Sequence, residues 1–149
     1  MRGLCLLVAT LIGAQPAQAQ KPAPLDTADF VVGKLRYHMD SAAVRAALGP
    51  PDSVRPRQGD VEWAYGAATV RIGWQGAVVT ISLTRPGTPT ARGLQVGDST
   101  SVLLALYGEP FDPASPVWDY SDPQDELHVM RVSVFRGRIR RIWFGWLEP

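Results

Sequence analysis

The chain has 149 residues, of which 46% are hydrophobic, and it carries 15 basic and 14 acidic side chains. This balance excludes the strongly basic surface with which proteins bind nucleic acid, so we expect no nucleic-acid partner. The single cysteine, Cys5, excludes an internal disulfide framework and a metal centre built from several thiolates, so a packed core must supply the stability.

Residues 1–19 are typical of a secretory signal peptide. Arg2 precedes an apolar stretch from Leu4 to Gly13, and the small residues Ala17 and Ala19 follow it. The apolar stretch is too short to cross, as a helix, a bilayer core of about 30 Å. Cys5 stands too close to the start to follow a lipid-attachment box. We therefore predict cleavage after Ala19 and a periplasmic or secreted protein without a lipid anchor, which leaves peripheral membrane association open.

Residues 20–34 are predicted to form an N-terminal arm, and its first part, from Gln20 to Leu25, is expected to be loose. Pro22 and Pro24 lie in that part, and proline cannot donate the backbone hydrogen bond that a helix interior or a central strand requires. We therefore assign residues 20–34 to neither of the two structural units that follow.

Residues 35–84 and 94–149 show the same order of landmarks, which is the pattern of an internal repeat. Each stretch has an acidic residue before a short helical pattern, a glycine and proline stop, a Trp-x-Tyr motif and a glycine turn between alternating segments. Matched residues are 55 to 61 positions apart: Asp40 and Asp98, Val44 and Val102, Leu48 and Leu106, Trp63 and Trp118, Tyr65 and Tyr120, Gly76 and Gly137, Ile81 and Ile142. Residues 85–93, rich in proline, glycine and threonine, are predicted to be a linker.

Each repeat is predicted to begin with a short helix. Asp40 and Asp98 are the expected N-caps, because a carboxylate accepts hydrogen bonds from the free N–H groups of a helix start. Helical spacing predicts one apolar face per helix, made of Val44, Ala47 and Leu48 in the first repeat and of Val102, Ala105 and Leu106 in the second. Helices of about two to three turns are not stable alone, so each must pack on a sheet.

The rest of each repeat alternates between apolar and polar residues, as antiparallel strands with one buried face do. Turns are expected at Gln75-Gly76 and Arg136-Gly137. The residues expected on the buried face include Val70, Ile72, Trp74, Val79, Ile81, Leu83, Met130, Val132 and Val134. The predicted fold class is α+β, with two tandem helix-plus-three-stranded antiparallel units whose sheets are either separate or joined into one. Trp63 and Trp118 are predicted to anchor the core.

These motifs resemble the SmpA/OmlA (BamE) family of small bacterial proteins associated with the outer membrane. The matching residues are Asp40, Val44, Leu48, Gly49, Pro51, Trp63, Tyr65, Gly76, Val78 and Ile81, and in the second repeat Asp98, Val102, Leu106, Gly108, Pro110, Trp118, Tyr120, Gly137, Ile139 and Ile142. Two such units in tandem are also similar to the β-lactamase-inhibitor-protein fold, in which paired repeats present a curved sheet to another protein. The resemblance implies a cell-envelope role close to outer-membrane assembly, or the binding of a secreted enzyme.

Arginine and aromatic side chains gather on the last predicted hairpin, and Arg131, Arg141 and Trp143 are the predicted partner-binding residues. On a two-residue period Arg141 and Trp143 share one face of their strand. Ile142 and Phe144 share the other, which is expected to pack on the helices. Arginine and tryptophan are favoured at protein-binding hot spots. In the alternative interpretation Trp143 packs under a neighbouring loop or the arm.

We assign no catalytic residue, no metal ligand and no cofactor, because the chain lacks a nucleophile elbow, a phosphate-binding loop and a dinucleotide fingerprint. Enzyme activity is therefore not expected. A small hydrolase or an ion-binding protein is the rival from another class. Its residues would be His128, His38 and the acidic cluster of Asp119, Asp122, Asp125 and Glu126.

We therefore expect an exported, non-catalytic module of the bacterial cell envelope that binds a protein or another envelope component with the open face of its sheet. A secreted enzyme inhibitor is the alternative that the tandem resemblance implies. It would insert a loop, either Pro50 to Gly59 or Phe111 to Asp125, into its target.

Overall fold

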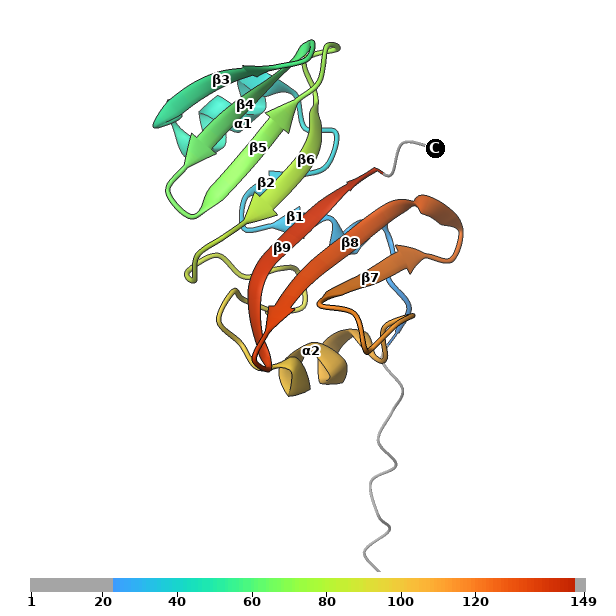
Figure 1. Cartoon of the computed structure of the whole chain (residues 1–149). Coiled ribbons are helices and arrows are strands. Elements are labelled where there is room, and N and C mark those ends of the chain that lie inside the picture. Colours follow the sequence, from blue (N-terminus) through green and yellow to red (C-terminus); the bar gives the residue numbers. More distant parts are fainter. Residues whose placement is uncertain (1–22, 147–149) are drawn as a thin grey trace, which may run out of the picture.

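The structure, a computed structural model, describes residues 23–146 (Figure 1). The predicted signal peptide, residues 1–19, and its cleavage site lie outside the described residues. Within residues 23–146 no helix is both long enough and apolar enough to cross a membrane.

A seven-stranded antiparallel sheet forms the body of the protein, in the order β3-β4-β5-β6-β9-β8-β7. The strands are β3 (Ser53–Arg57), β4 (Asp60–Tyr65), β5 (Ala68–Ile72), β6 (Val78–Leu83), β7 (Val117–Asp122), β8 (Asp125–Phe135) and β9 (Arg138–Trp146). A short hairpin, β1 (Val31–Val32) and β2 (Leu35–Arg36), follows the 3-10 helix η1 (Thr27–Asp29). Helix α1 (Ser41–Leu48) lies behind β4 and β5, and α2 (Thr100–Tyr107) lies near the turn between β8 and β9 (Figure 1).

The expectation of two tandem helix-plus-three-stranded units is wrong. The first half of the chain supplies four strands to the sheet, and β6 pairs directly with β9, so that both halves form one sheet. The additional strand, β3, contains Pro56 and lies within Pro50 to Gly59, the stretch that the inhibitor alternative expects to be a loop. Proline is tolerated in β3 because β3 lies at the edge of the sheet. An N–H on the outer side of an edge strand pairs with no neighbouring strand, so its absence costs no hydrogen bond between strands.

One face of the sheet is buried beneath the helices and the N-terminal segment. Alternate residues of neighbouring strands line up across it, and one such row crosses six strands: Trp63, Val70, Ile81, Phe144, Met130 and Tyr120. Every residue of this row is at most 8% exposed. Trp118, in a neighbouring row, is equally buried, which confirms that Trp63 and Trp118 belong to the core.

The two helix starts differ, although both were expected to be capped by aspartate. Asp40 is the N-cap of α1, and its Oδ1 accepts a hydrogen bond of 2.7 Å from the backbone N–H of Ala43. In α2 the N-cap is Ser99, and Asp98 accepts from the N–H of Gln95 instead. The capping prediction is therefore confirmed for Asp40 and wrong for Asp98, because α2 begins one residue later than the repeat implied.

The buried face of α2 also differs from the expected one. Leu103 and Tyr107, four residues apart, are the buried residues of this helix, whereas Val102 is 39% exposed. In α1 Val44 is buried as expected, but Leu48 lies at the exposed end of the helix. Both the start of α2 and its first buried residue therefore lie one residue later in the chain than the repeat predicts.

From Ala23 onward, the N-terminal segment packs against the rest of the protein rather than lying loose. Its anchor is Arg92, which makes five hydrogen bonds, two to the Asp29 carboxylate and one each to the backbone carbonyls of Ala23, Pro24 and Leu106. This network ties the N-terminal segment to the expected linker and to the end of α2.

Alkaline pH is expected to destabilise the protein through two buried tyrosines, Tyr107 and Tyr120. Burial raises the pKa of both phenols above the ordinary value. The unfolded chain therefore loses these protons first, so stability is complete below about pH 10 and falls as the pH rises toward the folded-state pKa values.

Each tyrosine should contribute a slope of up to about 1.4 kcal/mol per pH unit in that window. Urea unfolding followed from about pH 9 upward measures the slope, and Tyr120→Phe should flatten it. Stability that stays constant through this range would contradict the burial of the two phenols.

Candidate functional site

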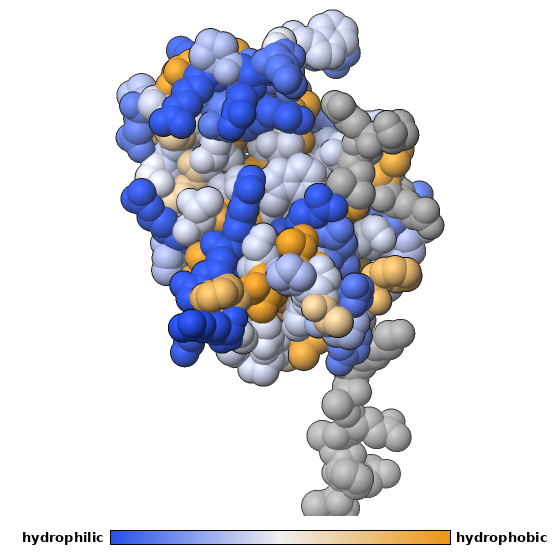
Figure 2. All heavy atoms as spheres, viewed as in Figure 1, coloured by the Kyte–Doolittle hydropathy of each residue, from blue (hydrophilic) through white to orange (hydrophobic). Residues whose placement is uncertain are grey.

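The face of the sheet opposite the helices is polar, and we call it the open face. Side chains alternate along each strand, so the neighbours of buried residues point to this side. One row across it runs through Ala64, Thr69, Ser82, Trp143, Arg131 and Asp119. Figure 2 shows this side of the molecule, where hydrophilic and neutral residues predominate and hydrophobic ones form small patches.

A groove of about 790 Å³ crosses the open face from β3 to β9. A second hollow, of about 140 Å³, lies beside it over β8 and β9. The groove is lined by Pro56, Arg57, Gln58, Asp60, Glu62, Thr69, Arg71, Trp74, Thr80, Ser82, Thr84, Arg141 and Trp143. The hollow is lined by Arg131, Ser133, Arg141 and Trp143, so the three predicted partner-binding residues lie together on one surface.

Trp143 owes its position on this face to Gly145, two residues further along β9. A Cβ atom at position 145 would lie 2.5 Å from Cζ2 of Trp143 and 2.9 Å from Cγ2 of Thr80. The indole therefore occupies the space that a side chain at Gly145 would fill. Trp143 is half-buried in this position, whereas Arg141 is exposed.

Gly145→Ala should displace the indole of Trp143 and lower the free energy of unfolding by about 1–3 kcal/mol, the usual cost of overpacking. The indole N–H signal of Trp143, assigned with a Trp143→Phe variant, reports the displacement by NMR, and urea unfolding reports the stability. An indole signal that does not move would contradict the contact with Gly145.

Arg131 is held by an acidic partner. Its Nε and Nη2 each donate a hydrogen bond of 2.8 Å to the carboxylate of Asp119 on the neighbouring strand β7. This hydrogen bonding raises the pKa of Arg131 above its ordinary value. Its guanidinium carbon lies 6.0 Å from the centre of the Trp143 ring, so arginine and tryptophan form a continuous surface.

Two arginines that line the groove are also paired with acids. Arg57 lies 3.5 Å from Glu62, and Nε of Arg71 lies 3.2 Å from Oδ2 of Asp60. The second pair is electrostatic only, because this Nε is buried without a hydrogen bond. Arg141 is different: its Nε donates a hydrogen bond of 2.8 Å to the hydroxyl of Ser82.

The remaining arginines of the last hairpin serve other contacts. Arg136 and Arg140 lie over the ring of Phe135, with their guanidinium carbons 5.1 and 5.6 Å from its centre. Arg138 donates to the backbone carbonyl of Gly97. Of the five arginines of this hairpin, only Arg131 and Arg141 line the groove or the hollow.

The two histidines come together, although ninety residues separate them in the chain. Their ring centres are 6.2 Å apart, and the ring of His128 also contacts Phe30, Tyr37 and Trp146. The residues that the structure describes contain no cluster of three or more side chains able to hold a metal ion. The side chains that surround the two histidines in these contacts are the aromatic rings of Phe30, Tyr37 and Trp146.

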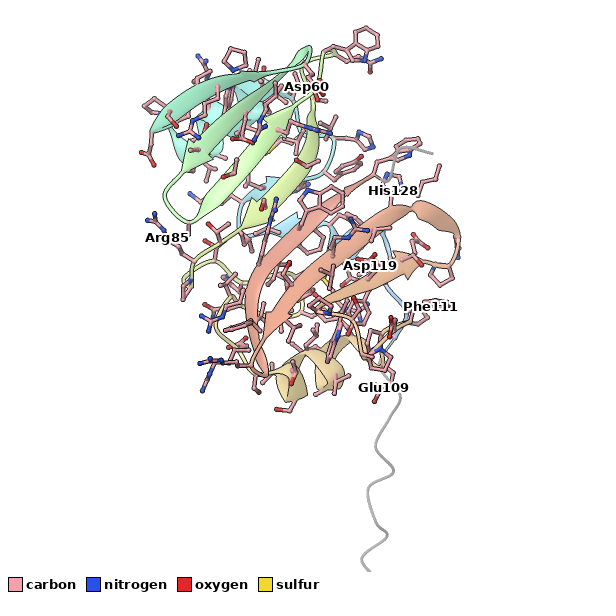
Figure 3. The ribbon with its side chains drawn as sticks, viewed as in Figure 1. Asp60, Arg85, Glu109, Phe111, Asp119 and His128 are labelled. Carbon is pink, nitrogen blue, oxygen red and sulfur yellow. The ribbon has the colours of Figure 1, made fainter. Side chains whose placement is uncertain are left out.

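The acidic cluster between Trp118 and Leu127 is divided between different contacts. Asp119 pairs with Arg131, while Asp122 is buried and accepts a hydrogen bond from the backbone N–H of Gln124. The side chains of Asp125 and Glu126 lie outside the described part of the structure. Figure 3 labels one member of this cluster, Asp119, which lies over a different part of the sheet from Asp60, an acid of the groove.

Sequence reasoning missed several residues of the groove. Ser82 and Thr80 alternate with the buried Ile81, and this period, combined with the β6–β9 pairing, would have placed them beside Trp143. Trp74 was expected on the buried face with Val70, but it lies beyond the end of β5 and is 82% exposed. Strand β5 ends at Ile72, so the alternation of its side chains does not extend to Trp74.

No family model matches the chain, and no curated protein matches it. One similar solved structure is the crystal structure of an extracellular protein containing a SCP domain from Bacillus anthracis, with 9% sequence identity and a TM-score of 0.48. The alignment covers 93% of this chain and 50% of that one, so the chain spans half the length of that structure. The function must therefore be argued from the site itself.

Proposed function

We propose that this protein is an exported, non-catalytic module of the bacterial cell envelope that binds a protein partner on the open face. The observation that carries the proposal is the groove, which brings Arg141 and Trp143 together on a seven-stranded sheet. Arginine and tryptophan on a preformed surface are the residues that most often dominate binding energy. The signal-peptide pattern of residues 1–19 and the resemblance to SmpA/OmlA (BamE) proteins support the envelope location.

Binding rather than catalysis is favoured by how the charged groups of the groove are engaged. Asp60 and Glu62 are paired with arginines, and the hydroxyl of Ser82 accepts a hydrogen bond from Arg141. A hydroxyl nucleophile needs a neighbouring general base that takes its proton, and a carboxylate held by an arginine is a weaker base. The described residues that line the groove include no histidine, which fits a surface for recognition.

Capture of the partner tests this proposal. The purified protein is used as bait in an envelope extract beside an Arg141→Ala, Trp143→Ala variant. The matched control is Arg140→Ala, Phe135→Ala, which removes the same kinds of side chain from the same hairpin outside the groove. We expect one protein to be retained by the wild type and by the control and to be lost from the groove variant. Equal retention by all three would refute binding through the open face.

A second candidate function, inhibition of a secreted enzyme by an inserted loop, is favoured by one observation. Phe111, which follows α2, is 98% exposed and stands at the edge of the molecule away from Asp60 (Figure 3). An exposed aromatic ring is a common anchor in a partner's pocket. Half of the other loop considered, Pro50 to Gly59, is the edge strand β3 (Ser53–Arg57).

A further inference from the structure

The lining of the groove carries one positive charge in excess of its negative charges. It contains three arginines against one aspartate and one glutamate. Arg57 and Arg71 are the arginines that pair with these acids. The uncompensated charge therefore belongs to Arg141, for which the described part of the structure shows no ion pair.

Arg141 is held in position while its binding groups stay available. Its Nε is fixed by Ser82, a hydroxyl on β6 that is only 6% exposed. Within residues 23–146 its two terminal nitrogens make no hydrogen bond, and the side chain is exposed. A guanidinium bound through Nε alone keeps the donors of Nη1 and Nη2, which match the two oxygens of a carboxylate.

The surroundings of Arg141 are suited to one acidic side chain. The hollow of about 140 Å³ that it shares with Arg131, Ser133 and Trp143 holds about five water volumes at roughly 30 Å³ each. Trp143 supplies an apolar wall for methylene groups. Arg131 adds little net charge because Asp119 neutralises it.

We infer that the protein partner of the open face places a single aspartate or glutamate side chain on Arg141, against Trp143. This inference rests on the proposed function. A polyanion such as an acidic polysaccharide fits less well, because Arg57, Arg71 and Arg131 are already paired with acids and offer its further negative charges no uncompensated partner. Ser82 is a positioning residue, because it acts only through Arg141.

The test uses short capped peptides as probes of the purified protein, observed by NMR through the Nε–H signal of Arg141 and the indole N–H signal of Trp143. A peptide with one central glutamate should shift both signals, and the same peptide with glutamine should not. Arg141→Gln should raise the dissociation constant of the glutamate peptide by at least about tenfold, as expected for loss of a charge-assisted bidentate contact. Ser82→Ala should raise it less.

Arg140→Gln is the matched control, because Arg140 lies in the same strand but outside the groove and should leave the affinity unchanged. Equal shifts with the glutamine peptide, an equal loss in the Arg140 variant, or tighter binding of polygalacturonate than of the glutamate peptide would each overturn the inference. If the captured partner is lost from the double groove variant but binds Arg141→Gln with full affinity, the proposed function stands and this inference fails. If no partner depends on the groove, the proposed function itself fails.

Discussion

Replacing Arg92 by alanine is expected to lower the free energy of unfolding by about 3–5 kcal/mol, the range for removing one partner of a buried ion pair. The side chains of Arg92 and Asp29 are only 18% and 7% exposed. Without Arg92, the buried Asp29 carboxylate loses its ion pair and keeps only the hydrogen bond from the N–H of Asp26, and the carbonyls of Ala23, Pro24 and Leu106 lose the donor that Arg92 provides. Urea unfolding measures the loss.

Two further variants make this prediction specific. Arg55→Ala removes an exposed arginine for which the described residues provide no ion pair, and it should change stability by less than about 0.5 kcal/mol. Adding Asp29→Asn to Arg92→Ala should recover part of the loss, because the buried negative charge disappears. A cost below about 1 kcal/mol for Arg92→Ala would contradict the role of this residue as the anchor of the N-terminal segment.

Phe144→Ala is expected to cost about 3–5 kcal/mol, because it deletes a large, fully buried ring from the centre of the sheet. Phe144 pairs with Ile81 on β6 and Met130 on β8, and its ring meets that of Phe30 at 5.5 Å. The residue thus joins both halves of the sheet to the N-terminal segment.

The control for this variant is Phe135→Ala, on the same hairpin but 55% exposed. It should cost far less, because most of its ring is already in water. Similar losses for both variants would show that the β6–β9 contact is not the centre of the core.

Local features of the chain were predictable because they depend on a few neighbouring residues. The cap at Asp40 and the turns at Gly76 and Gly137, both with positive φ, follow from the chemistry of single positions. The burial of Trp63 and Trp118 was predicted from their matching places in the two repeats. Alternation also placed Arg141 and Trp143 on the same face of β9.

Features that depend on long-range pairing were not predictable. The sequence of Ser53–Arg57 alone does not indicate a strand, because Pro56 cannot donate a hydrogen bond to a neighbouring strand. The segment can be a strand because the fold places it at the edge of the sheet. The anchoring of Ala23 and Pro24 depends on Arg92, which follows almost seventy residues later. For the same reason the partner of Arg141, Ser82 on a distant strand, was missed.

Oxidative labelling of side chains, with and without the captured partner, tests binding through the open face most directly. Trp74, at the rim of the groove, and Phe111, on the loop after α2, are both strongly exposed in the free protein at 82% and 98%. The account predicts that the partner protects Trp74 and Trp143 and leaves the labelling of Phe111 unchanged. Protection of Phe111 with unchanged labelling of Trp74 and Trp143 would contradict it and would favour the inserted loop of an inhibitor.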